Sequence, residues 1–531
     1  MDGEINMVWA VLGEESGRIK LVSKDKVPAM LPKGSYLTIE EGDSKFILRV
    51  DDSKQHESYS PSTMLIDMNL APLKQDQKCQ NIIHAYRVKD LVNRADGLID
   101  YIKPLSIARR STQEEIDIAM EGNKSGAKVF PATLHYSQCQ LLKDENQNLI
   151  TANMPDDMFF HQMLVCGKTG TGKTVATKYL AQYFVEDLEG AVLAINVKDV
   201  DFLKMDKPST TKNQNILDEW NSLGKSAHGI NNFSIYYPAN TEISATKQIS
   251  TELSTKITLN VNEIEPESLT GLLKDISDIG AQHLPNIFRY WKNEFVKTSG
   301  EDTTFNNFVE YFIRGERDGR LFRTLNTRGE EGSAPLHKGT FDNILRSLDY
   351  ARDFFDNEGA ESLDENDILV RGKLSVIDVT GEKGVQFGAI LLRDLLHRIV
   401  KAKSEQRSDV PILIIIDEVH MFYNSDATQE ALGDLDVICR TGRSQEIGVI
   451  FSSQNPTDIP RGLSSVINTK IFFKSDSTSV KSFGVSVRPE EMENLKKGYA
   501  IASIYDLSQL KILKFPLAFA GVFDKGGNLD G

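Results

Sequence analysis

Cysteine is scarce in this chain. Its 531 residues include four cysteines, at positions 79, 139, 166 and 439, and they lie too far apart to form a paired set of metal ligands. Cys166 and Cys439 stand among apolar residues, so we interpret them as small buried hydrophobic side chains. The sequence therefore argues against a disulfide-stapled scaffold and against a cysteine-based zinc site.

Long hydrophobic runs are also missing. The longest apolar runs, such as Ile412–Ile416, are far shorter than the roughly 20 residues of a membrane-spanning helix. The start of the chain, Met1–Gly13, has no basic stretch ahead of an apolar one, so we predict no signal peptide. We expect a cytoplasmic protein without membrane association.

The chain has no excess of basic residues either. Its net charge is −15, with 40% hydrophobic and 26% charged residues, which is an ordinary composition for a soluble globular protein. The length allows two to four domains. An acidic chain can still bind nucleic acid through a local basic surface, such as the lumen of a ring. The net charge therefore does not exclude DNA as a partner.

The first ninety residues contain short segments in which apolar and polar residues alternate. These segments are Met7–Leu12, Arg18–Ser23, Ser35–Glu41, Lys45–Asp51, Ser62–Met68 and Asn81–Val88. Glycine, proline and acidic turn clusters separate several of them. Short strands with turn signals between them are typical of a small barrel, and we predict an N-terminal β-barrel over residues 1–95.

Further along, apolar strands alternate with helices. The predicted strands include Met163–Cys166, Ala191–Val197, Leu374–Val379, Ile412–Asp417, Ile447–Ser453 and Lys470–Lys474. Apolar strands that alternate with helices indicate an α/β fold with a parallel sheet covered on both faces. Between residues 207 and 358 the apolar residues recur at helical spacing instead, as in Pro285–Val296 and Phe305–Arg314. We predict a helical insertion there.

The strongest motif in the chain is a glycine-rich loop between a strand and a helix. The loop fits the pattern G-x-x-x-x-G-K-[ST] with Gly167, Lys168, Thr169, Gly170, Thr171, Gly172, Lys173 and Thr174. Glycines let the backbone curl so that successive N–H groups face phosphate oxygens at the N-terminus of a helix. We predict that Lys173 reaches the β- and γ-phosphates of ATP and that the Thr174 hydroxyl binds Mg²⁺.

Two acidic residues end a second buried strand. Asp417 and Glu418 follow Ile412–Ile416. We predict that Asp417 holds Mg²⁺ and that Glu418 polarises the water that attacks the γ-phosphate. A GTPase is expected to carry an N-K-x-D element for base recognition, and the sequence has none. The pattern therefore favours an ATPase.

Other polar residues at strand ends are candidates for the same site. Gln454 follows the strand Ile447–Ser453 and could orient the attacking water, or it could cap a turn before Pro456. Arg440 and Arg443 precede that strand, and either could stabilise charge on the transferred phosphoryl group, from its own chain or from a neighbouring one. Each could equally be a surface arginine.

Two further strand ends carry weaker candidates. Asp378 ends Leu374–Val379 at the edge where parallel sheets bind ligands. Lys198, Asp199 and Asp201 follow Ala191–Val197, and we interpret these three as part of a polar loop.

The glycine-rich loop and Asp417-Glu418-Val419-His420 also match a DEAH-box RNA helicase. Those enzymes bind ATP between two motor domains of one chain. Here 114 residues follow Asp417, and the strands still missing from the first sheet use part of them. The remainder is too short for a second domain of about 100–150 residues. The missing wall of the site must then come from another subunit, which predicts a ring.

The motifs together resemble the HerA branch of the HerA/FtsK translocases. The resemblance rests on His161–Cys166 running into the loop, Ile377–Val379, Ile416–His420 and Arg443 through Pro456. It implies a RecA-like P-loop ATPase with an N-terminal barrel and a helical insertion, assembled as a hexamer that moves along double-stranded DNA. It also implies an arginine supplied by the neighbouring subunit. The ending Asn196-Val197-Lys198-Asp199 departs from the family pattern of acid, glycine and glutamate.

The resemblance also guides the domain assignment. We expect the barrel over 1–95, the first part of the ATPase core over 96–206, the helical insertion over 207–358, and the second part of the core with a C-terminal extension over 359–531.

Two functions follow from the resemblance. The first is an ATP-driven DNA translocase or helicase that works with a partner nuclease or another effector. The alternative is a scaffold ring whose nucleotide site controls the assembly of an anti-phage effector, either a nuclease or a sirtuin-like NADase, without processive translocation. For both, the predicted catalytic residues are Lys173, Glu418, Gln454 and Arg443, and the predicted metal ligands are Thr174 and Asp417.

Overall fold

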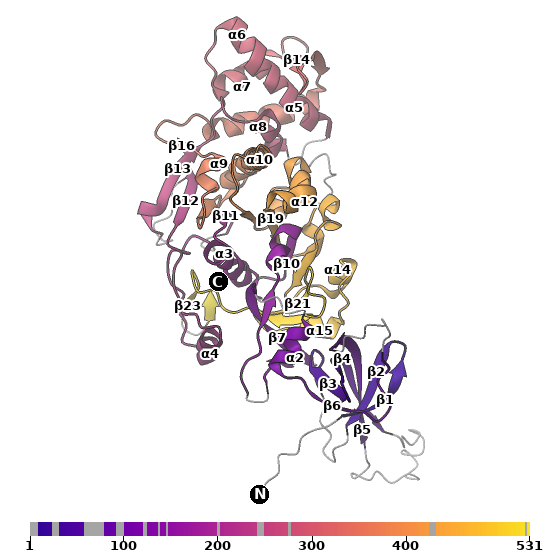
Figure 1. Cartoon of the computed structure of the whole chain (residues 1–531). Coiled ribbons are helices and arrows are strands. Elements are labelled where there is room, and N and C mark those ends of the chain that lie inside the picture. The colour runs from indigo at the N-terminus through magenta and orange to yellow at the C-terminus, as the bar shows by residue number, and fades with distance from the viewer. Residues whose placement is uncertain are drawn as a thin grey trace, which may run out of the picture. The chain divides into compact units, whose positions relative to one another are not determined.

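The structure is a computed structural model (Figure 1). It describes residues 9–23, 31–57, 79–91, 100–120, 125–135, 138–144, 147–198, 202–241, 249–273, 278–423, 432–525 and 528–530. The chain forms two compact units. We call Met1–Asp156 with Val485–Pro516 the barrel unit, and Asp157–Gly484 with Leu517–Gly531 the sheet unit. Among the described residues, no helix has both the length and the apolar character needed to cross a membrane.

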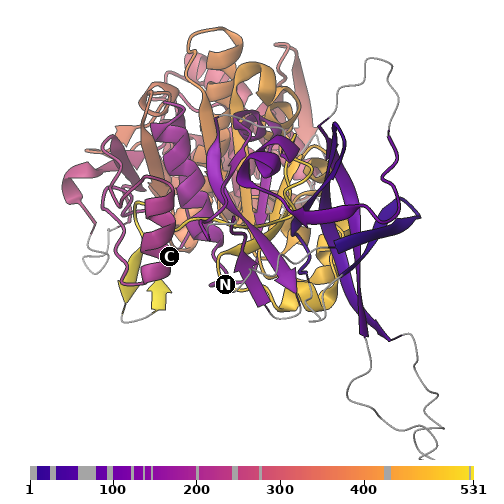
Figure 2. The ribbon, with the colours of Figure 1, turned by 60° about the horizontal axis from the view of Figure 1, so that its bottom comes forward.

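The barrel unit contains a closed antiparallel barrel in the order β1-β2-β5-β4-β3-β6, drawn in indigo and violet in Figure 2. Its strands are β1 Trp9–Glu15, β2 Arg18–Ser23, β3 Tyr36–Glu41, β4 Ser44–Glu57, β5 Cys79–Asp90 and β6 Ile107–Arg110. The pairing of β4 with β5 shifts register at two places, and such bulges bend a strand so that a sheet can close. The predicted barrel is confirmed.

The apolar residues of the alternating segments point into the barrel and fill its interior. Apolar side chains from all six strands form one buried cluster, which includes Trp9, Leu21, Leu37, Leu48, Ile83 and Ala108. The strand that closes the barrel, β6, lies beyond residue 95, where the sequence placed the boundary. The predicted strand Ser62–Met68 lies outside the described residues.

Segments from two distant parts of the chain complete the barrel unit. Helix α2 (Gln113–Ala119) is followed by β7 (Ala127–His135) and β8 (Gln138–Leu141). Strands β21 (Tyr499–Ser503) and β22 (Ile512–Lys514) join them, because β22 pairs antiparallel with β7. The barrel unit and the sheet unit therefore meet at residues 156, 484 and 516, and not at the predicted boundaries at 95 and 359. Strand pairing between residues 131 and 513 leaves no trace in local periodicity.

Nine described strands of the sheet unit pair in parallel in the order β16-β13-β12-β17-β11-β18-β19-β10-β20. Their bounds are β10 Met163–Cys166, β11 Ala191–Asn196, β12 Phe233–Pro238, β13 Ser254–Thr258, β16 Glu361–Ser362, β17 Leu374–Asp378, β18 Ile412–Ile416, β19 Ile447–Ser453 and β20 Thr469–Phe472. The central strands are buried along their whole length. The predicted parallel α/β sheet is confirmed.

Helices α3 and α12 pack on this sheet. Helix α3 (Lys173–Glu186) contacts β10, β11 and β18, and α12 (Asp434–Gln445) contacts β19 and α10 (Glu382–Ser404). Such a cover explains why the central strands are apolar on both faces. The backbone of β19 also lies close to the segment before β10. A Cβ on Gly448 of β19 would lie 2.3 Å from the carbonyl oxygen of Phe159.

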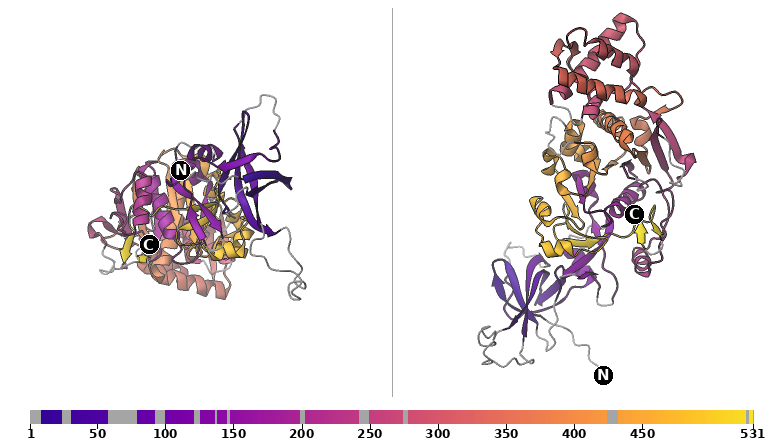
Figure 3. Two further views of the ribbon diagram at one scale, coloured as in Figure 1. Left: turned by 90° about the horizontal axis from the view of Figure 1, so that it is seen from below. Right: turned by 180° about the vertical axis from the view of Figure 1, so that it is seen from behind.

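The segment predicted as a helical insertion has one helix near its start and the other helices in its later part. Its helices are α4 Gln214–Ser222, α5 Asp278–Tyr290, α6 Val296–Ser299, α7 Phe305–Arg314 and α8 Lys338–Tyr350. The last four form a cluster with the hairpin β14–β15 (Leu321–Leu325 and Glu331–Pro335), seen in pink and red in Figure 3. Between α4 and α5, however, β12 and β13 belong to the parallel sheet. Both strands are only partly buried, so their residues do not form the continuous apolar runs that predicted the central strands.

Candidate functional site

The glycine-rich loop leaves the buried strand β10 and curls beside β20. Gly170 and Gly172 adopt the left-handed region, with φ of +77° and +113°, which glycine reaches at no steric cost. A Cβ on Gly167 would lie 2.6 Å from the Cβ of Phe473. The backbone N–H of Lys168 donates to the carbonyl of Lys474 at 2.9 Å, so the loop is fastened to the segment after β20.

Helix α3 begins directly at the end of this loop. Its N-cap, Gly172, has no side chain to cap the helix, so the first-turn N–H groups are open toward the loop. Lys173 is 6% exposed, and its ammonium donates to the carbonyl of Gly167 at 2.7 Å. Burial and the nearby charge of Lys198 lower the pKa of Lys173, while Glu418 and Asp417 act in the opposite direction. A buried ammonium beside free N–H groups forms a site for an anionic phosphate.

The two acids lie at the carboxyl end of β18, next to the loop. Asp417 is 6% exposed and accepts a hydrogen bond from the Ser452 hydroxyl at 2.7 Å. Glu418 is 3% exposed and has a left-handed backbone with φ of +47°. That conformation costs a non-glycine residue on the order of 1 kcal/mol or more, and it is often found at functional sites. Both carboxylates act electrostatically on Lys173, so the structure brings the three residues together.

Glu418 is held by two side chains from neighbouring strand ends. Its Oε1 atom forms an ion pair with Lys198, which follows β11, and accepts a hydrogen bond from the Gln454 amide at 3.1 Å. Burial alone would raise the pKa of Glu418, but Lys198 and Gln454 outweigh burial and hold the pKa below its ordinary value. Gln454 also accepts a hydrogen bond from the Thr169 hydroxyl at 3.4 Å. The amide thus joins the phosphate loop to Glu418.

Lys198 was a missed residue of this site. From the sequence it was interpreted, together with Asp199 and Asp201, as part of a polar loop, and those two aspartates lie outside the described residues. The available signal was its place after β11, because β11 pairs in parallel with β18 and their carboxyl ends therefore meet. Asp378, on the next strand β17, accepts hydrogen bonds from Asn196 and Thr380 and forms a polar cluster beside Lys198.

The two candidate arginines are not brought to this site. Both lie on α12, whose last turn leads into the first residue of β19. Gln454 follows the last residue of β19, and a strand of this length spans roughly 20 Å. Arg443 is exposed and forms no ion pair within the described part of the chain, whereas Arg440 pairs with Asp436 at 2.9 Å. An action of Arg443 on a phosphate therefore requires the site of another chain.

The residues present fit a magnesium ion. Thr174, in the first turn of α3, and the anchored carboxylate Asp417 offer hard oxygen ligands, which Mg²⁺ prefers. In the described ranges, no group of three or more His, Cys, Asp or Glu side chains could hold a metal. Two protein ligands suit an ion that takes its remaining ligands from water and from the phosphates of a bound nucleotide.

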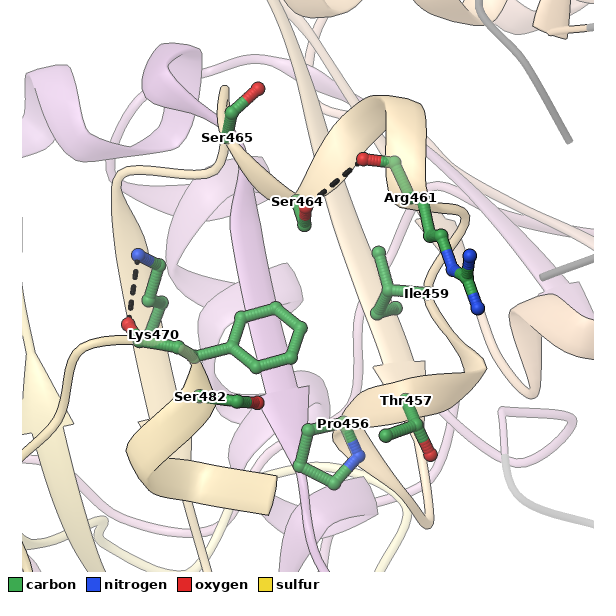
Figure 4. A pocket seen from close by; sticks show the side chains of 9 residues that line it. Pro456, Thr457, Ile459, Arg461, Ser464, Ser465, Lys470 and Ser482 are labelled. Atoms are coloured by element: carbon green, nitrogen blue, oxygen red, sulfur yellow. Dashed lines mark hydrogen bonds between the residues drawn. The ribbon is translucent and has the colours of Figure 1, made fainter. Parts of the chain in front are cut away.

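A separate pocket lies just beyond Gln454. It has a volume of about 520 Å³ and is lined by Pro456, Thr457, Ile459, Arg461, Ser464, Ser465, Lys470, Ser482 and Phe483 (Figure 4). Apolar side chains of Pro456 and Ile459 face its centre in this view, and the Lys470 ammonium donates to the Phe483 carbonyl at 3.2 Å. None of the predicted site residues lines this pocket.

Taken together, a parallel sheet, a phosphate loop with a buried lysine, and two acids at a neighbouring strand end define a P-loop ATPase. The family model described as "Helicase HerA, central domain" matches residues 140–395, and "Helicase HerA-like C-terminal" matches residues 386–495. The two matches span about two thirds of the chain. The chain belongs to the HerA-type ATPases, as the resemblance predicted.

Individual relatives are more distant. The DNA double-strand break repair helicase HerA of Sulfurisphaera tokodaii is 23% identical over 171 residues, which are 30% of this chain and 34% of that protein. The chain thus matches about a third of the length of this curated relative. VirB4 of Thermoanaerobacter pseudethanolicus is 14% identical with a TM-score of 0.45, covering 74% of this chain and 97% of VirB4. The plasmid coupling protein TrwB with a GTP analogue is 15% identical with a TM-score of 0.44, covering 71% and 89%.

The space around two glycines predicts different effects of alanine substitution on the free energy of unfolding. Gly167→Ala adds a methyl group against Phe473 and Thr171, so we expect it to lower the free energy of unfolding by about 1–3 kcal/mol. Gly339→Ala, in the first turn of α8 with open space around it, should leave stability unchanged or raise it by up to about 1 kcal/mol. Urea unfolding followed by circular dichroism measures both. Equal stability of the Gly167→Ala and unsubstituted chains would contradict the packing described.

Proposed function

We propose that this chain hydrolyses ATP with Mg²⁺ and that the hydrolysis drives movement along double-stranded DNA. One observation carries the proposal: Lys173, Asp417, Glu418 and Gln454 meet at the carboxyl ends of adjacent parallel strands. In this proposal Lys173 binds the β- and γ-phosphates, Glu418 accepts a proton from the attacking water, and Gln454 orients that water. Thr174 and Asp417 would hold Mg²⁺, which neutralises phosphate charge when bound.

Movement along DNA is supported by the family models, whose descriptions name a helicase, and by the name of the curated relative. The incomplete site supports assembly of several copies. Its phosphate loop, base and amide come from one chain, while Arg443 lies at the opposite edge of the sheet. We propose a homo-hexameric ring in which Arg443 of one subunit approaches the γ-phosphate held by the next.

Two substitutions test the catalytic assignment. We expect Lys173→Ala to abolish ATP binding, because it removes the buried cation of the phosphate site. Glu418→Gln should retain ATP binding but lower the hydrolysis rate by about 10²–10⁴-fold, because an amide cannot accept the proton. Steady-state phosphate release, measured with and without duplex DNA, gives both rates. The unsubstituted chain should be stimulated by duplex DNA.

Lys225→Met serves as the control for these measurements, because it removes an ion pair with Asp187 that lies outside the site. Hydrolysis that duplex DNA leaves unchanged would count against the motor. Hydrolysis that survives in Lys173→Ala would count against the site itself.

Mixing experiments test whether Arg443 acts on a neighbouring subunit. Arg443→Ala and Glu418→Gln chains should each be inactive alone, because each lacks one half of every site. When the two are assembled together, some interfaces combine an intact Glu418 with an intact Arg443, and hydrolysis should reappear. Arg440→Ala should remain active, since Arg440 is already paired with Asp436. No recovery on mixing, or full activity of Arg443→Ala alone, would rule out this arrangement.

The scaffold function has one observation in its favour. The barrel unit has its own closed sheet and its own buried core, as expected of a module that docks a partner. We propose a nuclease or a sirtuin-like NADase as the docked effector. Glu418→Gln rings should then still activate the co-expressed effector, measured as DNA cleavage or NAD⁺ loss. An effector that is inactive with Glu418→Gln rings but active with unsubstituted rings would favour the motor instead.

A further inference from the structure

The carboxylate proposed as the catalytic base is already occupied by a cation. Glu418 Oε1 is bound by Lys198 and by Gln454, while Oε2 lacks a hydrogen-bond partner among the described residues. The other charged or titratable groups that face Glu418 are Lys173 on α3, Asp417 before it, and His420, whose Nδ1 lies 3.6 Å from Oε2. A carboxylate paired with an ammonium is a poor proton acceptor. Catalysis therefore requires this ion pair to open.

Lys198 is built so that its side chain can move while its backbone stays fixed. Asn196, at the end of β11, donates to the carbonyl of Lys198 at 2.7 Å and to Asp378 at 3.2 Å. These bonds hold the backbone carbonyl of Lys198 beside the end of β11. The Lys198 side chain is 39% exposed, in contrast to 4% for Glu418. The lysine is thus the mobile partner of the pair.

The two lysines of the site repel each other in the structure described. Both ammonium groups lie at the same edge of the sheet, because Lys198 is ion-paired with Glu418 and Gln454 joins that carboxylate to Thr169 of the loop that leads to Lys173. The charge of Lys198 also lowers the pKa of Lys173. A γ-phosphate at Lys173 would reverse this relation, because it carries more negative charge than a carboxylate and lies between two cations. Lys198 would then be drawn from Glu418 to the phosphate. ADP has no γ-phosphate and offers no such attraction.

We propose that Lys198 is a positioning residue that senses the γ-phosphate, holding Glu418 in the empty or ADP-bound site and moving to the γ-phosphate when ATP binds. The move releases Glu418 Oε1 while Gln454 remains beside it, so that base and amide can hold the attacking water. Phosphate release returns Lys198 to Glu418. This proposal rests on the proposed ATPase function and adds the control of its base.

Binding measurements without turnover test the contact with the γ-phosphate. A Glu418→Gln chain lacks the ion pair between Glu418 and Lys198, so in this chain the contact of Lys198 with the nucleotide does not compete with that pair. Adding Lys198→Met to this chain should weaken binding of a non-hydrolysable ATP analogue about tenfold, the value of one charge-assisted hydrogen bond, and change ADP binding less than twofold. Adding Lys225→Met, which removes a similarly exposed lysine, should change neither. Equal effects on the two nucleotides would overturn the proposal.

Turnover measurements test whether Lys198 leaves Glu418. If Lys198 moves to the phosphate, Lys198→Met lowers kcat several-fold with its native Glu418, and Lys198→Arg retains most of kcat because the charge is kept. If Lys198 stays on Glu418 throughout, Lys198→Met raises kcat by freeing the base, and the proposal is wrong. Thermal unfolding of Lys198→Met should match the unsubstituted chain. If Lys198→Met misfolds, Lys198→Gln replaces it in both measurements, with the same expected outcomes, because it also removes the charge of the side chain.

The outcome also separates this proposal from the ATPase function. If the unsubstituted chain binds no ATP, or binds it equally well as Lys173→Ala, both proposals fall. If ATP binding depends on Lys173 and hydrolysis on Glu418 but Lys198→Met changes nothing, only the γ-phosphate sensor falls.

Discussion

Parallel pairing of β11, β18, β19 and β10 is the constraint on which the site depends. Because these strands run in one direction with little offset in register, their carboxyl ends meet at one edge. Each end carries part of the site: Lys198 follows β11, Asp417 and Glu418 follow β18, Gln454 follows β19, and the phosphate loop follows β10. The strands themselves are fully buried, so the edge is rigid, and small residues such as Gly448 let the layers approach closely. The chemistry is local, but its geometry comes from the whole sheet.

The site joins charges that would be costly to bury alone. Lys173, Asp417 and Glu418 are each less than 10% exposed, and a buried unpaired charge is strongly unfavourable. Here each has an opposite charge or a hydrogen-bond donor beside it, as Ser452 provides for Asp417. A bound nucleotide adds negative charge beside Lys173 and therefore changes the electrostatic interactions among these three side chains.

The sequence was sufficient for features encoded by neighbouring residues. The phosphate loop, the strand before Asp417, the alternation inside the barrel and α7 (Phe305–Arg314) follow from local patterns, and the structure has each of them. It was insufficient where distant segments meet. The pairing of β22 with β7 and the addition of β12 and β13 to the sheet depend on contacts that periodicity does not encode. Lys198 was missed for the same reason, since only the register of β11 beside β18 brings it to Glu418.

The barrel unit is assembled from two stretches of chain, with residues Asp157–Gly484 of the sheet unit between them. During synthesis, β7 therefore emerges long before its partner β22, and its edge stays unpaired while the ATPase core is being made. An open strand edge invites pairing with other chains. The order of the chain thus makes the pairing of β7 with β22 wait until residues 157–484 have been made, although the six-stranded barrel is complete by Arg110. A product truncated before β22 would therefore carry the nucleotide site together with an open strand edge on β7.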